Sequence, residues 1–238
     1  IHTDEKSVYS GAVTILFRPF AEESGRELLH DMTRALEAGQ EAYLVCQMLD
    51  SCALESAVLS AQELRQRCNL ASAPEEPLLT QGENIWFVEP VLPLPRVILL
   101  GGGHVAQCMA RQLELLEYRT WVVEDREAFA TPSLFPAAER VILSDYDCAE
   151  AQLDLNARDR AIVVSRGHET DFEILRWLIK KDLAYIGCIG SRKKIALLRE
   201  KLLAEGIAKE QIDKLHAPIG LPIGAETPAQ IAVSVAAE

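Results

Sequence analysis

A glycine-rich turn is the first group of residues whose types and spacing could do chemistry. The run GGGHVA consists of Gly101, Gly102, Gly103, His104, Val105 and Ala106, and it follows an apolar segment directly. In this G-x-G-x-x-A pattern, Gly101 permits a tight turn, Gly103 lets the backbone approach a phosphate, and small Ala106 lets a helix pack closely on the preceding strand. The start of that helix offers free N–H groups to an anion. The sequence therefore predicts a phosphate site, where His104 either donates to the ligand or packs against the protein.

An acidic residue stands where the next strand is predicted to end. Asp125 lies 24 positions after Gly101, and an acid at this place commonly accepts a hydrogen bond from a ribose hydroxyl. Arg126 follows it and could instead face a 2′-phosphate, so the type of nucleotide stays open. The alternative explanation for the whole pattern is a tight turn that binds no ligand.

A second cluster consists of Arg166, Gly167 and His168 and follows another predicted strand. Open α/β sheets bind ligands at the carboxyl ends of their strands, and a fourth strand here would face the glycine turn across the switch point of the sheet. The spacing of Thr170 and Glu173 is that of a capping box, which explains part of the motif structurally. The other three residues are therefore candidates for ligand binding.

A third cluster follows the next predicted strand and contains Gly190, Ser191, Arg192 and Lys193, with Lys194 after them. Ser191 is a good N-cap residue. Three consecutive cations in the first turn of a helix are unfavourable there unless an anion is bound. We therefore expect Arg192 and Lys193, more than Lys194, to contact an anion; the alternative is that these side chains extend into solvent.

The fourth motif is a loop rich in proline and glycine that contains Gly220 and Glu226 and precedes a last helix. Thr227 at the N-cap, Pro228 at the first helical position and Gln230 three residues after the cap predict where this helix starts. The apolar loop is expected to pack as a lip over the ligand. Glu226 would either bond an amine or pyrimidine edge of the ligand or cap neighbouring amides.

The elements that position these motifs follow a regular pattern after Arg96. Short apolar segments alternate with helical ones, which is typical of parallel βαβ units with helices on both faces of the sheet. The predicted strands are Val97–Leu100, Thr120–Glu124, Val141–Leu143, Ala161–Ser165 and Ala184–Cys188. The predicted helices are His104–Glu117, Asp171–Lys180 and Arg192–Glu205. The sequence thus predicts an α/β fold whose residues 93–238 form a Rossmann-like, doubly wound parallel sheet that binds a nucleotide or cofactor.

Residues 1–92 have a mixed pattern that predicts a smaller α+β domain. Its predicted strands are Ala12–Phe17, Tyr43–Leu49 and Ile85–Val88, and its predicted helix is Gly25–Ala38, ended by Gly39. The stretch Pro90–Pro95 is predicted to be a linker outside any sheet, since prolines rarely lie inside one.

Composition excludes several classes of protein. The formal net charge of −12 argues against a nucleic-acid partner, which needs a basic face. No apolar run approaches the roughly 20 residues of a membrane helix. The six cysteines form no C-x-x-C pair, so we expect reduced thiols in the cytoplasm. Because the chain begins at Ile1 and not at a methionine, we also expect a fragment, or the ordered part, of a longer protein, and we expect no signal peptide.

Taken together and in this order, the motifs resemble the xanthine dehydrogenase accessory protein family, XdhC/CoxI. The similar segments are GGGHVA, EDREAFA with PSLFPAAERVI, RGHETD, AYIGCIGSRKK and HAPIGLPIGAETPAQIAVSVAAE. The resemblance implies an N-terminal domain followed by a Rossmann domain. It further implies a chaperone that binds the molybdenum cofactor (molybdopterin in its mono- or dinucleotide form), assists its sulfuration and delivers it to hydroxylases such as xanthine dehydrogenase. A sulfur-donating desulfurase is then a further expected partner.

The chain departs from the family pattern near its start. Members usually carry Gly-Ser-x-Pro-Arg, Gly-Gly-Cys and Cys-Gly-Gly motifs, and none is present here. A role for cysteine in holding molybdenum or sulfur is therefore not carried over. An NAD(P)-dependent oxidoreductase is the main alternative function, and a nucleotide-sensing regulatory module is another. Small two-domain α/β proteins often pair, so a homodimer is a further expectation.

Overall fold

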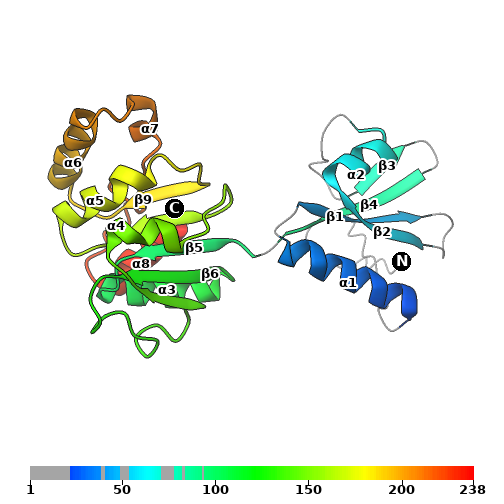
Figure 1. Cartoon of the computed structure of the whole chain (residues 1–238), viewed down its shortest axis with the longest axis horizontal. Helices are drawn as coiled ribbons and strands as arrows, with labels where there is room; N and C mark the ends of the chain where they lie inside the picture. Colours follow the sequence, from blue (N-terminus) through cyan, green and yellow to red (C-terminus); the bar gives the residue numbers. More distant parts are fainter. Residues whose placement is uncertain (1–21, 39–40, 49–53, 71–77, 82–83, 93) are drawn as a thin grey trace. The chain divides into compact units, whose positions relative to one another are not determined.

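The computed structural model describes residues 22–38, 41–48, 54–70, 78–81, 84–92 and 94–238. It divides the chain into two compact units, Ile1–Pro93 and Leu94–Glu238, each with its own sheet and hydrophobic core (Figure 1). The predicted strand Ala12–Phe17 and the predicted C′ glycine, Gly39, lie outside the described residues.

The described residues of the first unit form a four-stranded antiparallel sheet in the order β2-β1-β4-β3, with α1 on one face and α2 on the other. Successive residues of β1 point to opposite faces of the sheet, as in any strand. Leu44 packs with Leu28 of α1 on one face, and Val45 packs with Leu64 of α2 on the other. The elements are α1 (Glu23–Glu37), β1 (Ala42–Met48), β2 (Leu54–Ser60), α2 (Ala61–Arg67), β3 (Leu78–Gln81) and β4 (Asn84–Val91). The smaller α+β unit is as predicted, although the sequence did not indicate β2, α2 and β3.

Strand β4 contradicts the prediction that Pro90 belongs to a linker. Pro90 lies inside β4, opposite Tyr43 of β1. Strand β3 pairs only with the first part of β4, from Asn84 to Phe87, so among the described residues no strand pairs with this side of β4 at Pro90. A proline is tolerated at such a position because its nitrogen has no hydrogen to donate to a partner strand.

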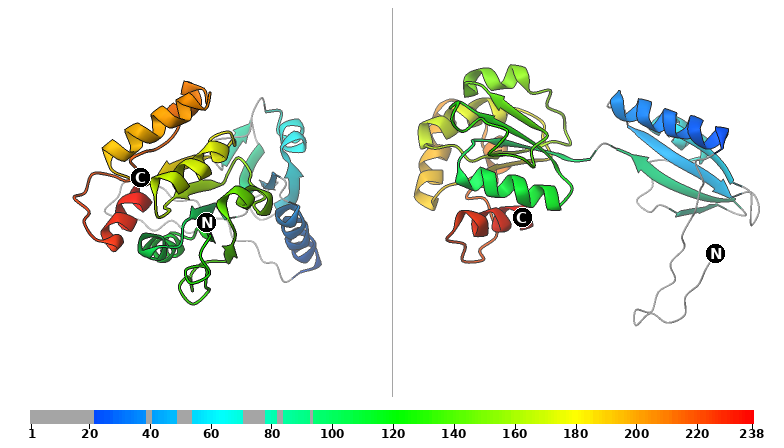
Figure 2. Two further views of the ribbon diagram at one scale, coloured as in Figure 1. Left: turned by 60° about the vertical axis from the view of Figure 1, so that its left-hand side comes forward. Right: turned by 90° about the horizontal axis from the view of Figure 1, so that it is seen from below.

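The second unit is a five-stranded parallel sheet in the order β7-β6-β5-β8-β9. Helices α3 and α8 cover one face, and α4, α5 and α6 cover the other (Figures 1 and 2). The elements are β5 (Arg96–Leu100), α3 (His104–Leu115), β6 (Arg119–Glu124), β7 (Arg140–Leu143), α4 (Tyr146–Ala149), β8 (Arg160–Val163), α5 (His168–Leu178), β9 (Tyr185–Cys188), α6 (Arg192–Ala204), α7 (Lys209–Asp213) and α8 (Pro228–Ala237). The predicted Rossmann-like, doubly wound sheet is confirmed.

Strand β5 lies at the centre of this sheet and creates the switch point. From β5 the chain proceeds to β6 and β7 on one side, and it later returns to form β8 and β9 on the other. The loops after β5 and β8 are therefore neighbours at the carboxyl edge of the sheet, as predicted. After α7, His216 pairs with Gly187 beside β9, and the chain then crosses to α8, which packs on α3.

The start of helix α5 differs from the prediction. The Asp171 N–H donates to the Gly167 carbonyl oxygen (3.0 Å), so the helix begins at His168 with Gly167 as its N-cap. Thr170 therefore lies within the first turn, and the predicted capping box of Thr170 and Glu173 is wrong. The capping box of Thr227 and Gln230 at α8 is confirmed. None of the helices in the described ranges has the length and apolar composition that a membrane span requires.

Candidate functional site

The glycine turn after β5 is held between the loops that follow β6 and β8. Gly101 has φ of 132°, and its N–H donates to the Val123 carbonyl oxygen (2.8 Å). A Cβ atom on Gly101 would lie 2.4 Å from the Val164 carbonyl oxygen, and one on Gly102 would lie 2.9 Å from the Phe129 carbonyl oxygen. Position 101 therefore requires glycine, because its φ is positive and because no room exists there for a Cβ atom.

Glu124, the last residue of β6, ties the turn to the neighbouring strand. Its carboxylate accepts from the Gly102 N–H (2.6 Å) and from Arg126 Nε (2.6 Å), and only 1% of the side chain is exposed. Burial by itself would raise the pKa of this carboxyl, but the hydrogen bonds from Arg126 and Gly102 outweigh it and lower the pKa to about 2. The sequence did not indicate Glu124, because the motif predicts an acid after the end of the strand, and Asp125 stands at that position.

Asp125 follows β6 and pairs across the turn with the loop after β8. Its Oδ2 lies 2.8 Å from Arg166 Nη2, and the two side chains are 17% and 51% exposed. Burial and the neighbouring Glu124 raise the pKa of Asp125, while the charge of Arg166 acts in the opposite direction. Two predicted site residues from different motifs are therefore brought together. Arg126, which we considered as a partner of a 2′-phosphate, donates to the Glu124 carboxylate. Its guanidinium lies 3.9 Å from the Phe129 ring centre.

Open space adjoins the two helices that start beside this ion pair. No described atom comes within 4 Å of a Cβ built on Gly103 or on Gly167. These two glycines are the N-caps of α3 and α5, and neither helix has a side-chain cap among the described residues. The first-turn N–H groups of both helices can therefore donate to an anion, since no side chain satisfies them.

The helix residues near this open space differ in exposure. His104 is exposed, Val105 is partly buried and Ala106 is fully buried against the sheet. His168 is exposed, and its Nε2 lies 3.0 Å from Glu169 Oε1. Ala106 thus has the packing role predicted for it, and the two histidines lie on the solvent side of the first turns of α3 and α5.

Helix α6 starts differently from α3 and α5. The Ser191 hydroxyl caps it by accepting from the Lys194 N–H (3.2 Å), as predicted. Arg192 and Lys193 are exposed, whereas Lys194 turns inward and pairs with the fully buried Asp171 of α5. Lys194, which we expected to matter least, is therefore a cation that links the first turns of α5 and α6.

The proline- and glycine-rich loop runs from the carboxyl end of β9, where the Ile219 N–H donates to the Cys188 carbonyl oxygen (3.1 Å), to the start of α8. Gly220 donates its N–H to Glu238 Oε2 (2.6 Å), and a Cβ on it would lie 2.5 Å from Ser234 Oγ. Gly220 is therefore packed against the second half of α8. Glu226 donates its N–H to Gln230 Oε1 (2.9 Å) just before α8, so its backbone takes part in the cap of that helix.

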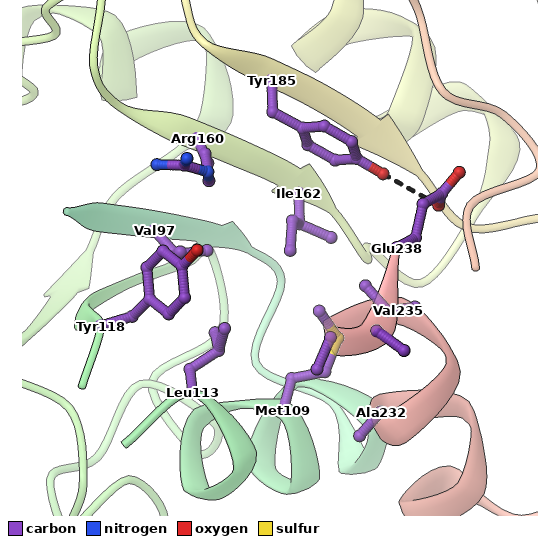
Figure 3. A pocket seen from close by; sticks show the side chains of 12 residues that line it. Val97, Met109, Leu113, Tyr118, Arg160, Ile162, Tyr185, Ala232, Val235 and Glu238 are labelled. Atoms are coloured by element: carbon purple, nitrogen blue, oxygen red, sulfur yellow. Dashed lines mark hydrogen bonds between the residues drawn. The ribbon is translucent and has the colours of Figure 1, made fainter. Parts of the chain in front are cut away.

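A separate apolar pocket of about 220 Å³ lies at the opposite, amino edge of the sheet. It lies between the first residues of the central strands and the ends of α3 and α8 (Figure 3). Tyr185 reaches across it to Glu238, with 2.9 Å between the phenol oxygen and Oε2. No predicted site residue lines this pocket.

The cysteines of the described residues differ in burial. Cys188 is buried beside Asp171, and burial together with that charge raises the pKa of its thiol to about 12. A thiol with such a pKa is a poor nucleophile. Cys148 is the exposed cysteine of the described part of the chain. Nowhere in that part do three His, Cys, Asp or Glu side chains gather as ligands for a metal ion.

The sheet order and the glycine turn at the switch point define a Rossmann-type domain. The family model of the XdhC Rossmann domain matches residues 97–238, and the chain belongs to this family. This confirms the resemblance seen in the motifs.

The chain is similar to curated relatives and to solved structures. The uncharacterized protein YqeB of Escherichia coli K12 is 36% identical over 145 residues, which are 60% of this chain and 26% of YqeB. A Bacillus subtilis 168 protein, named a probable xanthine dehydrogenase subunit, is 34% identical over 152 residues, which are 64% of this chain and 44% of that protein. A crystal structure from Bacillus halodurans, described as a xanthine dehydrogenase, has the same fold, with a TM-score of 0.70 at 22% identity over 91% of this chain and 63% of that one. The matches to the two curated relatives thus span less than half of the length of each.

Proposed function

We propose that this chain is an accessory protein that binds the phosphate end of a molybdopterin cofactor and passes the cofactor to a xanthine dehydrogenase-type hydroxylase. The observation that carries the proposal is the pair of uncapped helix starts at Gly103 and Gly167, with open space beside both and Arg166 at the same edge. Family membership supports it, as does the name of the Bacillus subtilis relative.

The residues at the carboxyl edge suit a phosphate group. Gly102 is not available, because its N–H already donates to Glu124, so the first-turn N–H groups of α3 would be the donors. Arg166 would supply the counter-charge, and the exposed positions of Arg192 and Lys193 would let them approach the ligand from the neighbouring loop. Such charge-assisted hydrogen bonds are about twice as strong as neutral ones.

Sulfuration of the cofactor would use a sulfur donor other than a buried thiol of this unit. The raised pKa of Cys188 leaves that residue unsuited to carry sulfur as a nucleophile. A desulfurase that delivers sulfur to the bound cofactor fits this requirement, and it remains part of the proposal along with the hydroxylase partner.

Titration calorimetry with molybdopterin, NAD⁺ and NADP⁺ tests the proposal. We expect molybdopterin to bind at micromolar concentration or below, and Arg192→Gln to bind it more weakly because the substitution removes counter-charge. Thr227→Ala, which removes the cap of a different helix, is the control with unchanged affinity. Absence of molybdopterin binding to the wild-type protein would contradict the proposed function.

An NAD(P)-dependent oxidoreductase is the second candidate. Asp125 favours it, because this carboxylate stands next to the turn and is partly exposed, as a partner of a ribose hydroxyl would be. Robust hydride transfer with aldehydes or hydroxy acids and either nicotinamide cofactor would favour this function over the first.

A further inference from the structure

The ion pair of Asp125 and Arg166 crosses the centre of the candidate site. Asp125 follows β6 and Arg166 follows β8, and both strands are direct neighbours of β5. Adjacent strands lie about 4.8 Å apart, so a contact between these two loops must pass over the carboxyl end of β5. The glycine turn begins at that end, and its Gly101 and Gly102 touch one loop each. The pair therefore lies where an anion on the turn would be bound.

Arg126 and Arg166, which both lie beside the glycine turn, are held very differently. Arg126 donates through Nε and Nη2 to the buried carboxylate of Glu124 and stacks on Phe129. Arg166 has a single hydrogen bond to Asp125 and is half exposed. Because Arg166 is half exposed, this pair contributes less to stability than a fully buried ion pair would. Arg166 is therefore the cation that can change partners at little cost, and Arg126 is not.

We infer that Asp125 occupies the place of the ligand's phosphate and competes with it for Arg166. In the free protein the Asp125 carboxylate neutralises Arg166 over the turn. A phosphate at the starts of α3 and α5 takes over Arg166 and displaces the carboxylate. Asp125 thereby sets a threshold: a ligand with a phosphate opens the pair, and a pterin without a phosphate does not. This inference rests on the proposed function and concerns the regulation of the same site.

The inference assigns Asp125 a role opposite to that of a ribose acceptor. An acceptor strengthens binding, so removing its charge would weaken the complex. A competitor weakens binding, so removing its charge would strengthen the complex. Asp125→Asn is close to isosteric and separates the two by the sign of its effect.

The experiment is a calorimetric titration of the whole chain with molybdopterin and, separately, with inorganic pyrophosphate. The variants are Asp125→Asn, Arg166→Gln and the double substitution. The control is Glu139→Gln, which breaks the pair of Glu139 with Arg119 (2.6 Å) at the amino edge of the sheet. We expect Asp125→Asn to bind molybdopterin about fivefold more tightly and Arg166→Gln about tenfold more weakly. In the double variant the gain from Asp125→Asn should be lost, and the control should bind as the wild type does.

Each outcome decides between the inference and the proposed function. If wild type and control bind molybdopterin but Asp125→Asn binds equally or more weakly, the competitor role is wrong and the proposed function stands. The same holds if Asp125→Asn still gains affinity when Arg166 is absent. If neither wild type nor any variant binds molybdopterin, the proposed function fails and the inference fails with it. A gain for pyrophosphate and molybdopterin, with none for a pterin without phosphate, supports the threshold.

Discussion

At the amino edge of the parallel sheet, Arg96 donates through Nε to Asp159 Oδ1 (2.9 Å) and lies 4.3 Å from the centre of the Trp121 ring. At the carboxyl edge, Arg166 makes one hydrogen bond to Asp125. Both are arginine–aspartate pairs between neighbouring or near-neighbouring strands. The first pair is 10% and 2% exposed, whereas Arg166 is half exposed.

The difference teaches that burial, and not residue type, separates a structural pair from one available to a ligand. Removing one partner of a buried pair leaves an uncompensated charge in the interior, which is costly. Removing one partner of an exposed pair costs little. Substitutions at the amino edge should therefore change the free energy of unfolding, and substitutions at the carboxyl edge should change ligand binding.

The largest expected effect is that of Arg96→Ala. It leaves the Asp159 carboxylate buried without its partner, so we expect a loss of about 3–5 kcal/mol in the free energy of unfolding. Urea denaturation measures it. Arg119→Gln, at an exposed pair of the same edge, is the control and should cost less than about 1 kcal/mol. Equal effects of the two variants would contradict the comparison.

Gly101→Ala should have the next largest effect. The substitution combines a positive φ that L-residues avoid with a Cβ placed 2.4 Å from a backbone oxygen, and neither can relax without moving β8. We expect a loss of about 3 kcal/mol in the free energy of unfolding, measured by urea denaturation. A loss under about 1 kcal/mol would show that the loop after β8 yields easily, and the turn would then not be rigid.

The sequence predicted much of this arrangement because its signals are local. The glycine run, the caps at Ser191 and Thr227, and the alternation of strands and helices each depend on residues close in the chain. These features were confirmed for that reason.

The features that the sequence did not predict depend on contacts between distant segments. The Glu124 carboxylate accepts a hydrogen bond from the Gly102 N–H only because β5 and β6 lie side by side. Lys194 turns inward because Asp171 of α5 is buried beside it. Pro90 belongs to β4 because that strand pairs with β1, where Tyr43 lies opposite it. In each case the partner lies far away in the sequence, so spacing alone gives no signal.

Glu124→Gln tests whether the buried acid of the carboxyl edge is structural. Its pKa is lowered from 4.5 to about 2 in the folded protein. A lowered pKa stabilises the fold above the unfolded value of about 4.5, and this contribution is lost as pH falls toward 2. We expect the wild type to exceed the variant by about 3 kcal/mol at pH 7. Urea denaturation between pH 7 and pH 2.5 should show this difference shrinking below pH 4.5. A difference that does not depend on pH would mean that the charge of Glu124 is not the cause.

Gly103→Ala should have the smallest effect on stability and the clearest effect on binding. Its φ of −71° and ψ of −179° are allowed for alanine, and no described atom would contact the new methyl group. We therefore expect a change of about 1 kcal/mol or less in the free energy of unfolding, as for alanine at an N-cap. The methyl group would, however, project into the space proposed for the phosphate, so molybdopterin affinity should fall about tenfold, as it does when a well-formed charged hydrogen bond is lost. Calorimetric titration with molybdopterin measures the affinity, and Gly101→Ala is the comparison variant. The two glycines lie in one turn, but only Gly101 is constrained by its φ and its neighbours. Unchanged affinity in a stable Gly103→Ala protein would mean that the phosphate does not approach this glycine, and the open space beside α3 would then not be the ligand's place.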